Sequence, residues 1–478
     1  MVLSETIRKR AIAMTILSQF EPSNTLKNLF ASIQESTKHL VSPVNQDFSI
    51  RNYTQFIEDT SEWLRLAACD SLVQNFELLD LNFKNSSLRK RDYYVHQTRE
   101  RTLITVFGLV RFKRTIYKDK GTGKTFIYVD RKLGLPKYDR YDPCVKSMIV
   151  EACANQNSMI KVGEQIGDRI FASYSTSDHR ENYRISRQTV YNTVKRPLPS
   201  ILELCKSRPT PSHLYIMADE KYVHMQRYES QSLMIKSAVI FEGIEGPQKR
   251  RKLINKMVYS GTESSFWRSV CDLLSNTYDM DKIKNITILG DGALWIKSGT
   301  REFSHSSFAL DKFHFKQALN HITTDRPTKD ILASNIINGN TETFNQIIKA
   351  LIDGTEQPSR KTTIEEKNNY ILRNALAIQY SYNGLKIGCS MESAISHNLA
   401  SIYSNRPKGY CRESLAAYLN LRNLYLNHID IRNLYLDSLD PKITKQKEDR
   451  YDFSMFEPRS SYDKSSSSKW LKGHIRRN

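Results

Sequence analysis

Asp219 and Asp291 stand at positions that favour chemistry over packing. Asp219 lies in the middle of an expected strand at 214–225, and Asp291 directly follows the apolar run Ile286-Thr-Ile-Leu-Gly290, which predicts another strand. A carboxylate between apolar strand neighbours is costly to bury unless it is paired or binds a metal ion. Open α/β sheets place their sites at the carboxyl ends of strands, where Asp291 is expected.

The elements that must position these acids follow the order βββαβαβ. Strands are expected at 214–225, 233–241, 253–259, 285–290 and 308–310, and a helix at 264–278. A ribonuclease H-like domain has this order: three strands paired as a meander, followed by alternating helices and strands. The pattern alone leaves other α/β topologies open. In that order the first and fourth strands are neighbours, so both carboxylates can reach one pocket.

Four motifs carry a resemblance to a known family. They are Met217-Ala-Asp-Glu-Lys-Tyr-Val-His224, Ile288-Leu-Gly-Asp-Gly-Ala-Leu-Trp-Ile296, Leu310-Asp-Lys-Phe-His314 and Cys389-Ser-Met-Glu-Ser-Ala-Ile-Ser-His397. In this order they resemble the ISLre-type insertion-sequence transposases of bacteria, which are distantly Mutator-like. The resemblance extends from near Arg91 to about Tyr425 and includes Asn405-Arg-Pro-Lys-Gly-Tyr410.

The resemblance implies a DDE triad of Asp219, Asp291 and Glu392 that is both catalytic and metal-binding. Glu342 is the alternative third acid. Related transposases carry an Asp-x-x-His between the second and third acids, and Asp311 with His314 resembles it as an accessory pair. A His at such a junction is more often structural than functional.

The implied activity is that of a DDE-type DNA transposase, which binds the ends of its insertion sequence, cleaves strands and transfers them into target DNA. Phosphodiester transfer needs two divalent cations about 4 Å apart. Carboxylates together with phosphate oxygens suit Mg²⁺, and we expect Mn²⁺ to substitute. Two alternatives stay open: a catalytically inactive, transposase-derived DNA-binding protein, and a structure-selective nuclease of ribonuclease H-like fold.

Composition supports a nucleic-acid partner. The 478 residues contain 71 Lys and Arg against 51 Asp and Glu, which gives a net charge of +20. A basic surface favours a polyanion. We expect double-stranded DNA, both element ends and target, as the partner of a homodimer or higher oligomer.

Two segments are predicted to contact DNA. The alternating residues 101–117 predict a β-meander with a basic face that contains Arg111, Lys113 and Arg114. The helix expected at 185–196 resembles the last helix of a helix-turn-helix variant, capped by Ser186. The hydrogen-bond donors of this helix would contact base edges or phosphates. The predicted DNA contacts in the helix are Arg187, Gln188, Asn192, Lys195 and Arg196, and Arg406 is a further predicted contact outside it. A plain three-helix bundle with a polar face is the alternative.

Other features exclude some classes of protein. No apolar run approaches the roughly 20 residues that cross a bilayer. The seven cysteines are far apart and form no Cys-x-x-Cys pair, which favours a reducing cytoplasm and, with DNA as partner, association with the nucleoid. Gly121-Thr-Gly-Lys-Thr125 lacks the first glycine of a phosphate-binding loop.

The expected fold class is α+β with several domains: a ribonuclease H-like α/β catalytic core with a helical insertion, preceded by a basic β-meander and a helix-turn-helix-like helical domain. The expected boundaries are 1–85 for an N-terminal helical region, 86–140 for the meander, 141–205 for the helical domain, 206–311 with 385–430 for the core, 312–384 for the insertion, and 431–478 for a basic, disordered tail.

Overall fold

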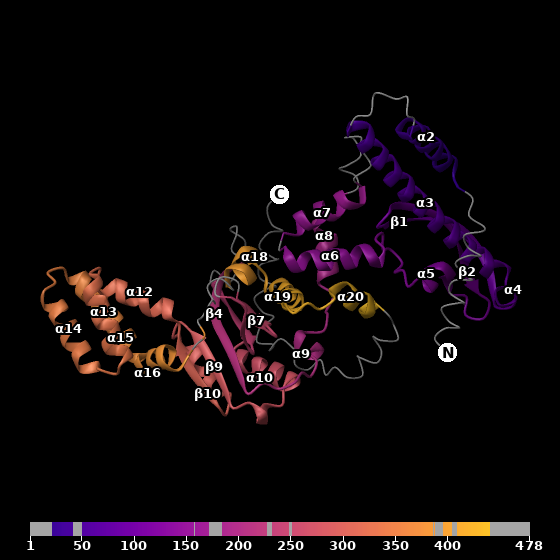
Figure 1. Cartoon of the computed structure of the whole chain (residues 1–478). Helices are drawn as coiled ribbons and strands as arrows, with labels where there is room; N and C mark the ends of the chain where they lie inside the picture. The colour runs from indigo at the N-terminus through magenta and orange to yellow at the C-terminus, as the bar shows by residue number, and fades with distance from the viewer. Residues whose placement is uncertain are drawn as a thin grey trace, which may run out of the picture. The chain divides into compact units, whose positions relative to one another are not determined.

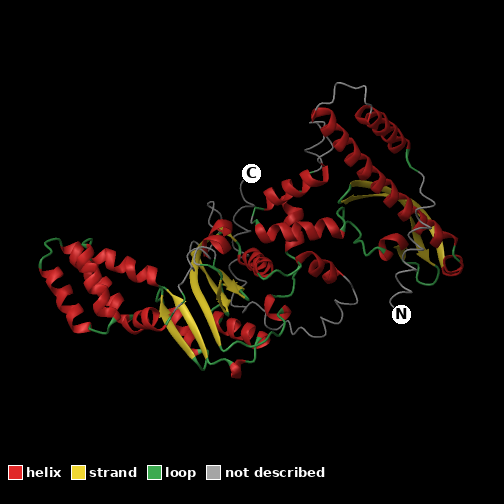
Figure 2. Ribbon diagram, viewed as in Figure 1, coloured by secondary structure: helices red, strands yellow, loops and turns green. Residues whose placement is uncertain are grey.

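The computed structural model describes residues 22–41, 50–156, 158–171, 184–226, 232–247, 251–385, 387, 395–403 and 409–439 (Figure 1). These residues form an α+β protein with many helices and several sheets (Figure 2). Contacts divide the chain into two units, Met1–Tyr435 and Leu436–Asn478. Among the described helices, none combines the length and apolar character needed to span a lipid bilayer. Of the expected disordered tail at 431–478, residues 431–439 form a helix, α20 (Ile431–Leu439), and residues 440–478 lie outside the described residues.

The first described part joins a long helix to a small antiparallel sheet. Its elements are α2 (Asn24–Val41), α3 (Ile50–Asn85), α4 (Ser87–Asp92), β1 (Tyr93–Thr105), β2 (Gly108–Asp119), β3 (Thr125–Ile127) and α5 (Tyr128–Lys132). The strand order β1-β2-β3 confirms the predicted meander. Helix α3 packs on the sheet, with the rings of Phe76 and Phe112 5.0 Å apart in an edge-to-face contact. Helix and sheet therefore share one apolar core.

Three helices follow, α6 (Pro143–Asn155), α7 (Met159–Phe171) and α8 (Arg187–Val194), and then the short α9 (Ile201–Leu204). The predicted cap is confirmed, because the Ser186 side chain accepts a hydrogen bond from the backbone N–H of Thr189 at 3.1 Å. Gly163 of α7 lets the chain before α8 approach closely, since a Cβ there would lie 2.2 Å from the Ile185 carbonyl oxygen. The three helices thus pack against one another.

The central sheet has six strands. They are β4 (His213–Met225), β5 (Ser232–Phe241), β8 (Met257–Gly261), β9 (Asn285–Gly290), β10 (Ser306–Leu310) and β11 (Gly409–Tyr410). The order is β10-β9-β4-β5-β8, with β11 beside β4. Strands β4, β5 and β8 form an antiparallel meander, whereas β9 and β11 run parallel to β4, and β10 runs parallel to β9.

The single strand expected at 253–259 is wrong. Residues there form two strands, β7 (Lys252–Ile254) and β8, and β7 pairs with β6 (Gly243–Glu245) in a separate two-stranded sheet. The break falls at Asn255, whose φ is 50°. Asn is one of the few residues that tolerate this left-handed conformation, so the chain turns there instead of continuing the strand.

Helices lie between and beside the strands of the central sheet: α10 (Phe266–Thr277), η2 (Met280–Lys282), α11 (Leu294–Ser298) and η3 (Gly299–Arg301). The buried side of α10 contains Phe266, Val270 and Leu273, none of which has an exposed surface. On β4, Leu214 and Ile216 are equally buried. Burial of these side chains is what holds the sheet and its helices together.

A helical insertion follows β10 and confirms the predicted helical character of 312–384. It contains α12 (Lys312–Ile322), α13 (Arg326–Ile337), α14 (Thr341–Asp353), α15 (Pro358–Arg373), α16 (Ala375–Gln379) and the π-helix η4 (Tyr380–Gly384). It has an apolar core of its own that includes Phe315, Phe344 and Ile371. Gly339, with φ of 83°, separates α13 from α14.

The last described elements return to the central sheet. After η5 (Ser396–Ala400), α18 (Ser401–Tyr403) and β11, helix α19 (Arg412–Leu426) lies along the edge strand β8, and α20 (Ile431–Leu439) follows it. The Asn423 amide accepts from the Ser260 N–H at 2.9 Å and donates to the Ser260 carbonyl at 2.8 Å. Asn427 does the same with Val258, at 3.0 and 2.7 Å. Two side chains thus pair with the backbone of β8 as a further strand would.

We predict that Asn423→Ala lowers the free energy of unfolding by about 2 to 4 kcal/mol, because both backbone groups of buried Ser260 lose their partner. Chemical denaturation measures the change. Glu413→Ala, on the exposed side of the same helix, is the control and is expected within about 0.5 kcal/mol of the unchanged protein. Equal stabilities for the two variants would contradict the edge-pairing role.

Candidate active site

The pairing of β4 with β9 brings Asp219 and Asp291 together. Met217 of β4 is opposite Leu289 of β9 in a parallel register, and each aspartate lies two residues beyond that pair. The expected adjacency of these two strands is therefore confirmed. On its other side β4 pairs with β5, where Asp219 is opposite Ser237. The charge of Asp291 acts directly on the Asp219 carboxylate.

The turn after β9 is shaped by glycines. A Cβ on Gly290 would lie 3.0 Å from the Ala218 carbonyl oxygen and 2.9 Å from the Ile296 side chain, so glycine allows β9 to approach β4 here. Gly292 has φ of 91°, which favours glycine. The Asp291 carboxylate accepts a hydrogen bond from the Ala293 N–H at 2.9 Å. This local bond directs the carboxylate of Asp291 within its turn.

Burial and neighbouring charge perturb the acids. Burial, followed by the charges of Glu220 and Asp291, raises the pKa of Asp219 to about 6, although the Glu220 N–H and His314 oppose the shift. Burial also raises the pKa of Glu220, and the charge of Asp291 adds to this effect. A bound cation is most favourable where partly buried carboxylates repel one another, because it neutralises their charges.

The accessory pair lies at the same strand ends. Asp311 follows β10, its N–H donates to the Gly290 carbonyl at 2.9 Å, and its carboxylate caps α12 by accepting from the Phe313 N–H at 3.0 Å. It is 7% exposed. His314, on the first turn of α12, acts electrostatically on Asp219. Asp311 thus has a clear structural role, while His314 lies near enough to oppose the rise in the pKa of Asp219.

The predicted third acid cannot be placed, since Glu392 and also Arg406 lie outside the described residues. Within the described part of the chain, no group of three or more His, Cys, Asp or Glu side chains is arranged to hold a metal ion. Asp219 and Asp291 supply two oxygen ligands of the kind that Mg²⁺ prefers, so they fit part of such a site. Glu342 lies exposed on the first turn of α14, within the helical insertion.

Three residues at the site were not predicted. The Glu220 carboxylate accepts a hydrogen bond from the Trp295 indole at 2.7 Å, which ties α11 to β4. The Tyr370 hydroxyl, from α15, donates to the Asp291 backbone carbonyl at 2.6 Å. Glu220 and Trp295 stand inside the motifs quoted above and could have been noticed there. Nothing in the sequence near Tyr370 indicates its contact across 79 residues.

The predicted DNA contacts on α8 are exposed. Arg187, Gln188, Asn192, Lys195 and Arg196 all lie at the surface, and Gln188 donates to the Asn192 side chain at 2.8 Å. The Lys195 ammonium lies 3.7 Å from the Glu413 carboxylate in a pair that is open to solvent. Five donor-rich side chains, three on α8 and two directly after it, thus lie at the surface.

The basic face of the meander is divided. Arg111 and Lys113 are exposed on β2. Arg114 instead forms an ion pair with Asp130, which also binds Arg101 at 2.7 Å, and all three side chains are largely buried. Burial and the charges of Arg101 and Arg99 lower the pKa of Arg114 to about 10. Arg114 therefore lies inside the protein, whereas its two neighbours along the strand face solvent.

These features define an α+β protein whose mixed central sheet brings an acid within β4 beside an acid that follows the neighbouring parallel strand β9. The chain belongs to the Uncharacterised protein family UPF0236, whose profile matches residues 50–438. It is similar to the UPF0236 proteins TTE0402 and TTE2489 of Caldanaerobacter subterraneus subsp. tengcongensis. Each is 29% identical over 83% of this chain, covering 78% and 83% of the relative, respectively.

We predict that the metal-free protein loses stability as pH rises from about 4 to above 6. The folded state binds the Asp219 proton more tightly than the unfolded chain does, so the stabilising proton is lost as pH passes the folded pKa of about 6. Asp219→Asn should be more stable than the unchanged protein at pH 7 by about 1 to 2 kcal/mol, a value reduced for partial exposure to solvent. Denaturation at pH 4 and pH 7 measures this, and a pH-independent difference would contradict it.

A second prediction concerns Glu220. We expect Glu220→Ala to cost about 1 to 2 kcal/mol, because the Trp295 indole loses its acceptor, whereas Glu220→Gln keeps an acceptor oxygen and should cost less. Denaturation, followed by tryptophan fluorescence, compares the two variants. If Glu220→Gln is as unstable as Glu220→Ala, the hydrogen bond is not what holds α11 to β4.

Proposed function

We propose that this chain is a DDE-type DNA transposase that binds the ends of its insertion sequence, cleaves strands and transfers them into target DNA. The observation that carries the proposal is the register of the neighbouring parallel strands β4 and β9, which brings Asp219 within β4 beside Asp291 at the carboxyl end of β9. Glu392 is the proposed third acid, and Mg²⁺, or Mn²⁺ in its place, the proposed cofactor.

The strand order supports a ribonuclease H-like core. Numbered along the chain, the five long strands of the sheet run 3-2-1-4-5, with the first three antiparallel and the last two parallel to the first. This is the order expected for that fold, and in it the first and fourth strands carry the first two acids. The resemblance of the four motifs is independent of this topology.

The residues suggest how such a site would work. Asp219 and Asp291 would hold divalent cations, which activate a water or 3′-hydroxyl nucleophile and stabilise the leaving oxygen. Tyr370 and the glycine turn hold the Asp291 backbone, and Glu220 holds α11 through Trp295. His314 is placed to interact with a phosphate or a water near Asp219. Protein groups thus fix the geometry before DNA binds.

Two further observations support a mobile element and a DNA partner. The name of one relative, which is 29% identical over 378 residues, joins eleven gene designations of a single organism. A protein encoded many times in one genome is expected for an element that copies or moves itself. The net charge of +20 and the exposed donors of α8 suit a polyanionic partner.

Two other functions are separated from this one by assay. An inactive, DNA-binding descendant has no need to keep Asp219 beside Asp291, and both are present with a raised Asp219 pKa. A structure-selective nuclease would share the acids and the metal ions but would cleave without joining strands. An assay that scores strand transfer as well as cleavage therefore separates the three.

We predict that Asp219→Ala, Asp291→Ala and Glu392→Gln each reduce Mg²⁺-dependent cleavage of cognate element ends by at least about a thousandfold, because each removes an acid on which metal-ion catalysis depends. Binding of the same DNA should change less than about threefold, since none of these acids binds phosphate directly. Gel assays with a supercoiled donor plasmid measure cleavage, and mobility shifts measure binding.

Glu342→Gln is the matched control, because Glu342 is exposed on α14 and is the alternative third acid. Full activity in Glu392→Gln together with loss in Glu342→Gln would assign the third acid to Glu342. Full activity in Asp219→Ala would overturn the proposed function itself.

A further inference from the structure

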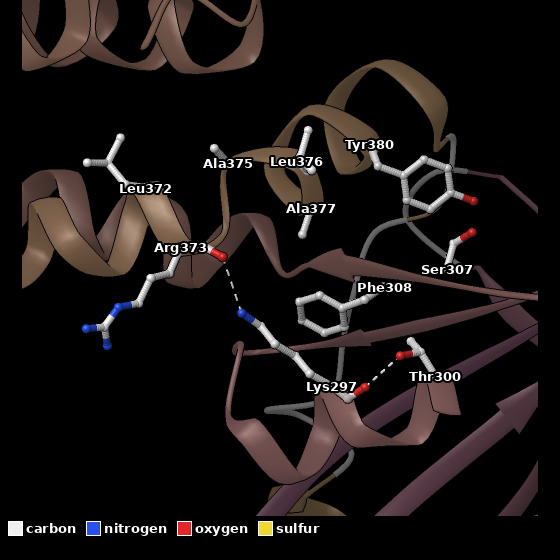
Figure 3. Close-up of a pocket in the computed structure, with 10 residues that line it drawn as sticks. All are labelled: Lys297, Thr300, Ser307, Phe308, Leu372, Arg373, Ala375, Leu376, Ala377 and Tyr380. Atoms are coloured by element: carbon white, nitrogen blue, oxygen red, sulfur yellow. Dashed lines mark hydrogen bonds between the residues drawn. The ribbon is translucent and has the colours of Figure 1, made fainter. Parts of the chain in front are cut away.

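A pocket of ≈ 500 Å³ lies where the helical insertion meets the edge of the central sheet (Figure 3). Its walls come from β10, from α11 with η3, and from the end of α15 with α16 and η4. The volume falls within the range of pockets that bind small organic groups. The lining residues are Lys297, Thr300, Ser307, Phe308, Leu372, Arg373, Ala375, Leu376, Ala377 and Tyr380.

The charge of this pocket favours an anion. Lys297 and Arg373 are the charged side chains among the described residues that line it, and both are cations. The Lys297 ammonium lies 3.5 Å from the Arg373 backbone carbonyl, and the Arg373 guanidinium extends away from Phe308 and Tyr380 toward the outside (Figure 3). Burial and then the charge of Arg373 lower the pKa of Lys297. A bound anion would relieve this repulsion between the two cations.

The remaining lining suits a nucleoside. The Phe308 ring lies 5.7 Å from the Lys297 ammonium, and Tyr380, drawn beside Ser307, is the second aromatic side chain of the lining (Figure 3). Leu376 is 81% exposed at the rim, an unusual position for a large apolar side chain. The hydroxyls of Thr300 and Ser307 donate to the Lys297 carbonyl at 2.8 Å and to the Asn285 side chain at 3.4 Å, so toward a ligand they act as acceptors. Aromatic and apolar surface beside cations is the combination that binds unpaired nucleotides.

Two residues of the pocket, Lys297 and Arg373, are linked to the candidate active site. Lys297 lies six residues after Asp291 in the chain, and the charge of Asp291 acts on it. Arg373 lies one turn after Tyr370, whose hydroxyl binds the Asp291 backbone carbonyl. A strand that passes the two aspartates can therefore present its neighbouring nucleotide to the pocket.

We propose that this pocket binds one nucleotide of an unpaired DNA strand, with Lys297 on one phosphate and Arg373 on the next. The proposal rests on the proposed function, and adds that the substrate strand is unpaired beside the active site. A base that leaves the duplex loses its base pairing and its stacking on neighbouring bases, and it gains stacking on protein side chains.

Binding of a fluorescent oligothymidine of about 12 nucleotides, within the site size of single-strand binding proteins, tests the proposal by anisotropy over a range of salt concentrations. Each phosphate contact on a single strand contributes about −0.7 to the log-log salt slope. The double variant Lys297→Gln, Arg373→Gln should therefore have a slope less steep by about 1.4 and bind roughly 25-fold more weakly at 0.1 M salt. Lys349→Gln is the control, since Lys349 is an exposed cation of α14 outside the pocket.

Ala375→Phe supplies a second variant that fills the pocket without changing charge. It should weaken oligothymidine binding while leaving the salt slope unchanged, and thermal melting checks that both variants are folded. A double variant with the slope of the Lys349→Gln control would overturn the proposal. Saturable binding of free thymidine monophosphate that the double variant loses, with oligothymidine binding unchanged, would overturn the assignment to a DNA strand.

Failure of the proposed function gives a different result. If the unchanged protein cleaves element ends but the double variant keeps its salt slope, only the pocket assignment is wrong. If the unchanged protein binds neither oligothymidine nor element ends, the proposed function is wrong and the pocket assignment fails with it.

Discussion

Parallel pairing of β4 with β9 is the contact on which the candidate active site depends. Paired residues of these strands, such as His213 and Asn285, are 72 positions apart in the chain. Their register brings two carboxylates close together although they repel each other. Burial of apolar side chains in the sheet offsets the unfavourable free energy of this repulsion, and Leu214, Ile216 and Ile288 have no exposed surface. Gly290 permits the approach because a larger residue would meet the Ala218 carbonyl. The fold thus holds together a pair of charges that would separate in an unfolded chain.

Helix α19 stabilises the other edge of the same sheet and ties distant parts of the chain to it. Asn423 and Asn427 pair with the backbone of β8, and the buried Arg422 donates to the carbonyls of Asn398 and Ala154 at 3.0 and 3.3 Å. One helix therefore binds the sheet, the helical segment α6 and the stretch that follows the proposed third acid. The short strand β11 adds a second anchor, since it pairs with β4 just beyond Asp219.

Local patterns were reliable where a single periodicity governs a segment. Helix α3, the meander, strands β4, β5 and β9, and the cap at Ser186 all formed where the sequence predicted them, because side-chain burial and capping act over a few residues. The pattern failed at 253–259, where one residue with positive φ divides an apolar run into strands of two different sheets. It also grouped Arg114 with exposed Arg111 and Lys113, although Arg114 is turned inward to Asp130. Because side chains alternate along a strand, Arg114 lies on the face opposite to Arg111 and Lys113, which the grouping overlooked.

The sequence alone determined the acidic motifs, their order, the net charge and the elements that carry them, because each of these is set by residue type and local spacing. The structure confirmed the expected adjacency of the strands that bring Asp219 beside Asp291. Only the tertiary structure decided that Glu220 holds Trp295 and that Tyr370 reaches the Asp291 backbone from a helix of the insertion. The pocket around Lys297 and Arg373 is likewise formed by segments about 75 residues apart. Such contacts depend on how strands and helices pack across long separations, and packing leaves no periodic signal in the chain.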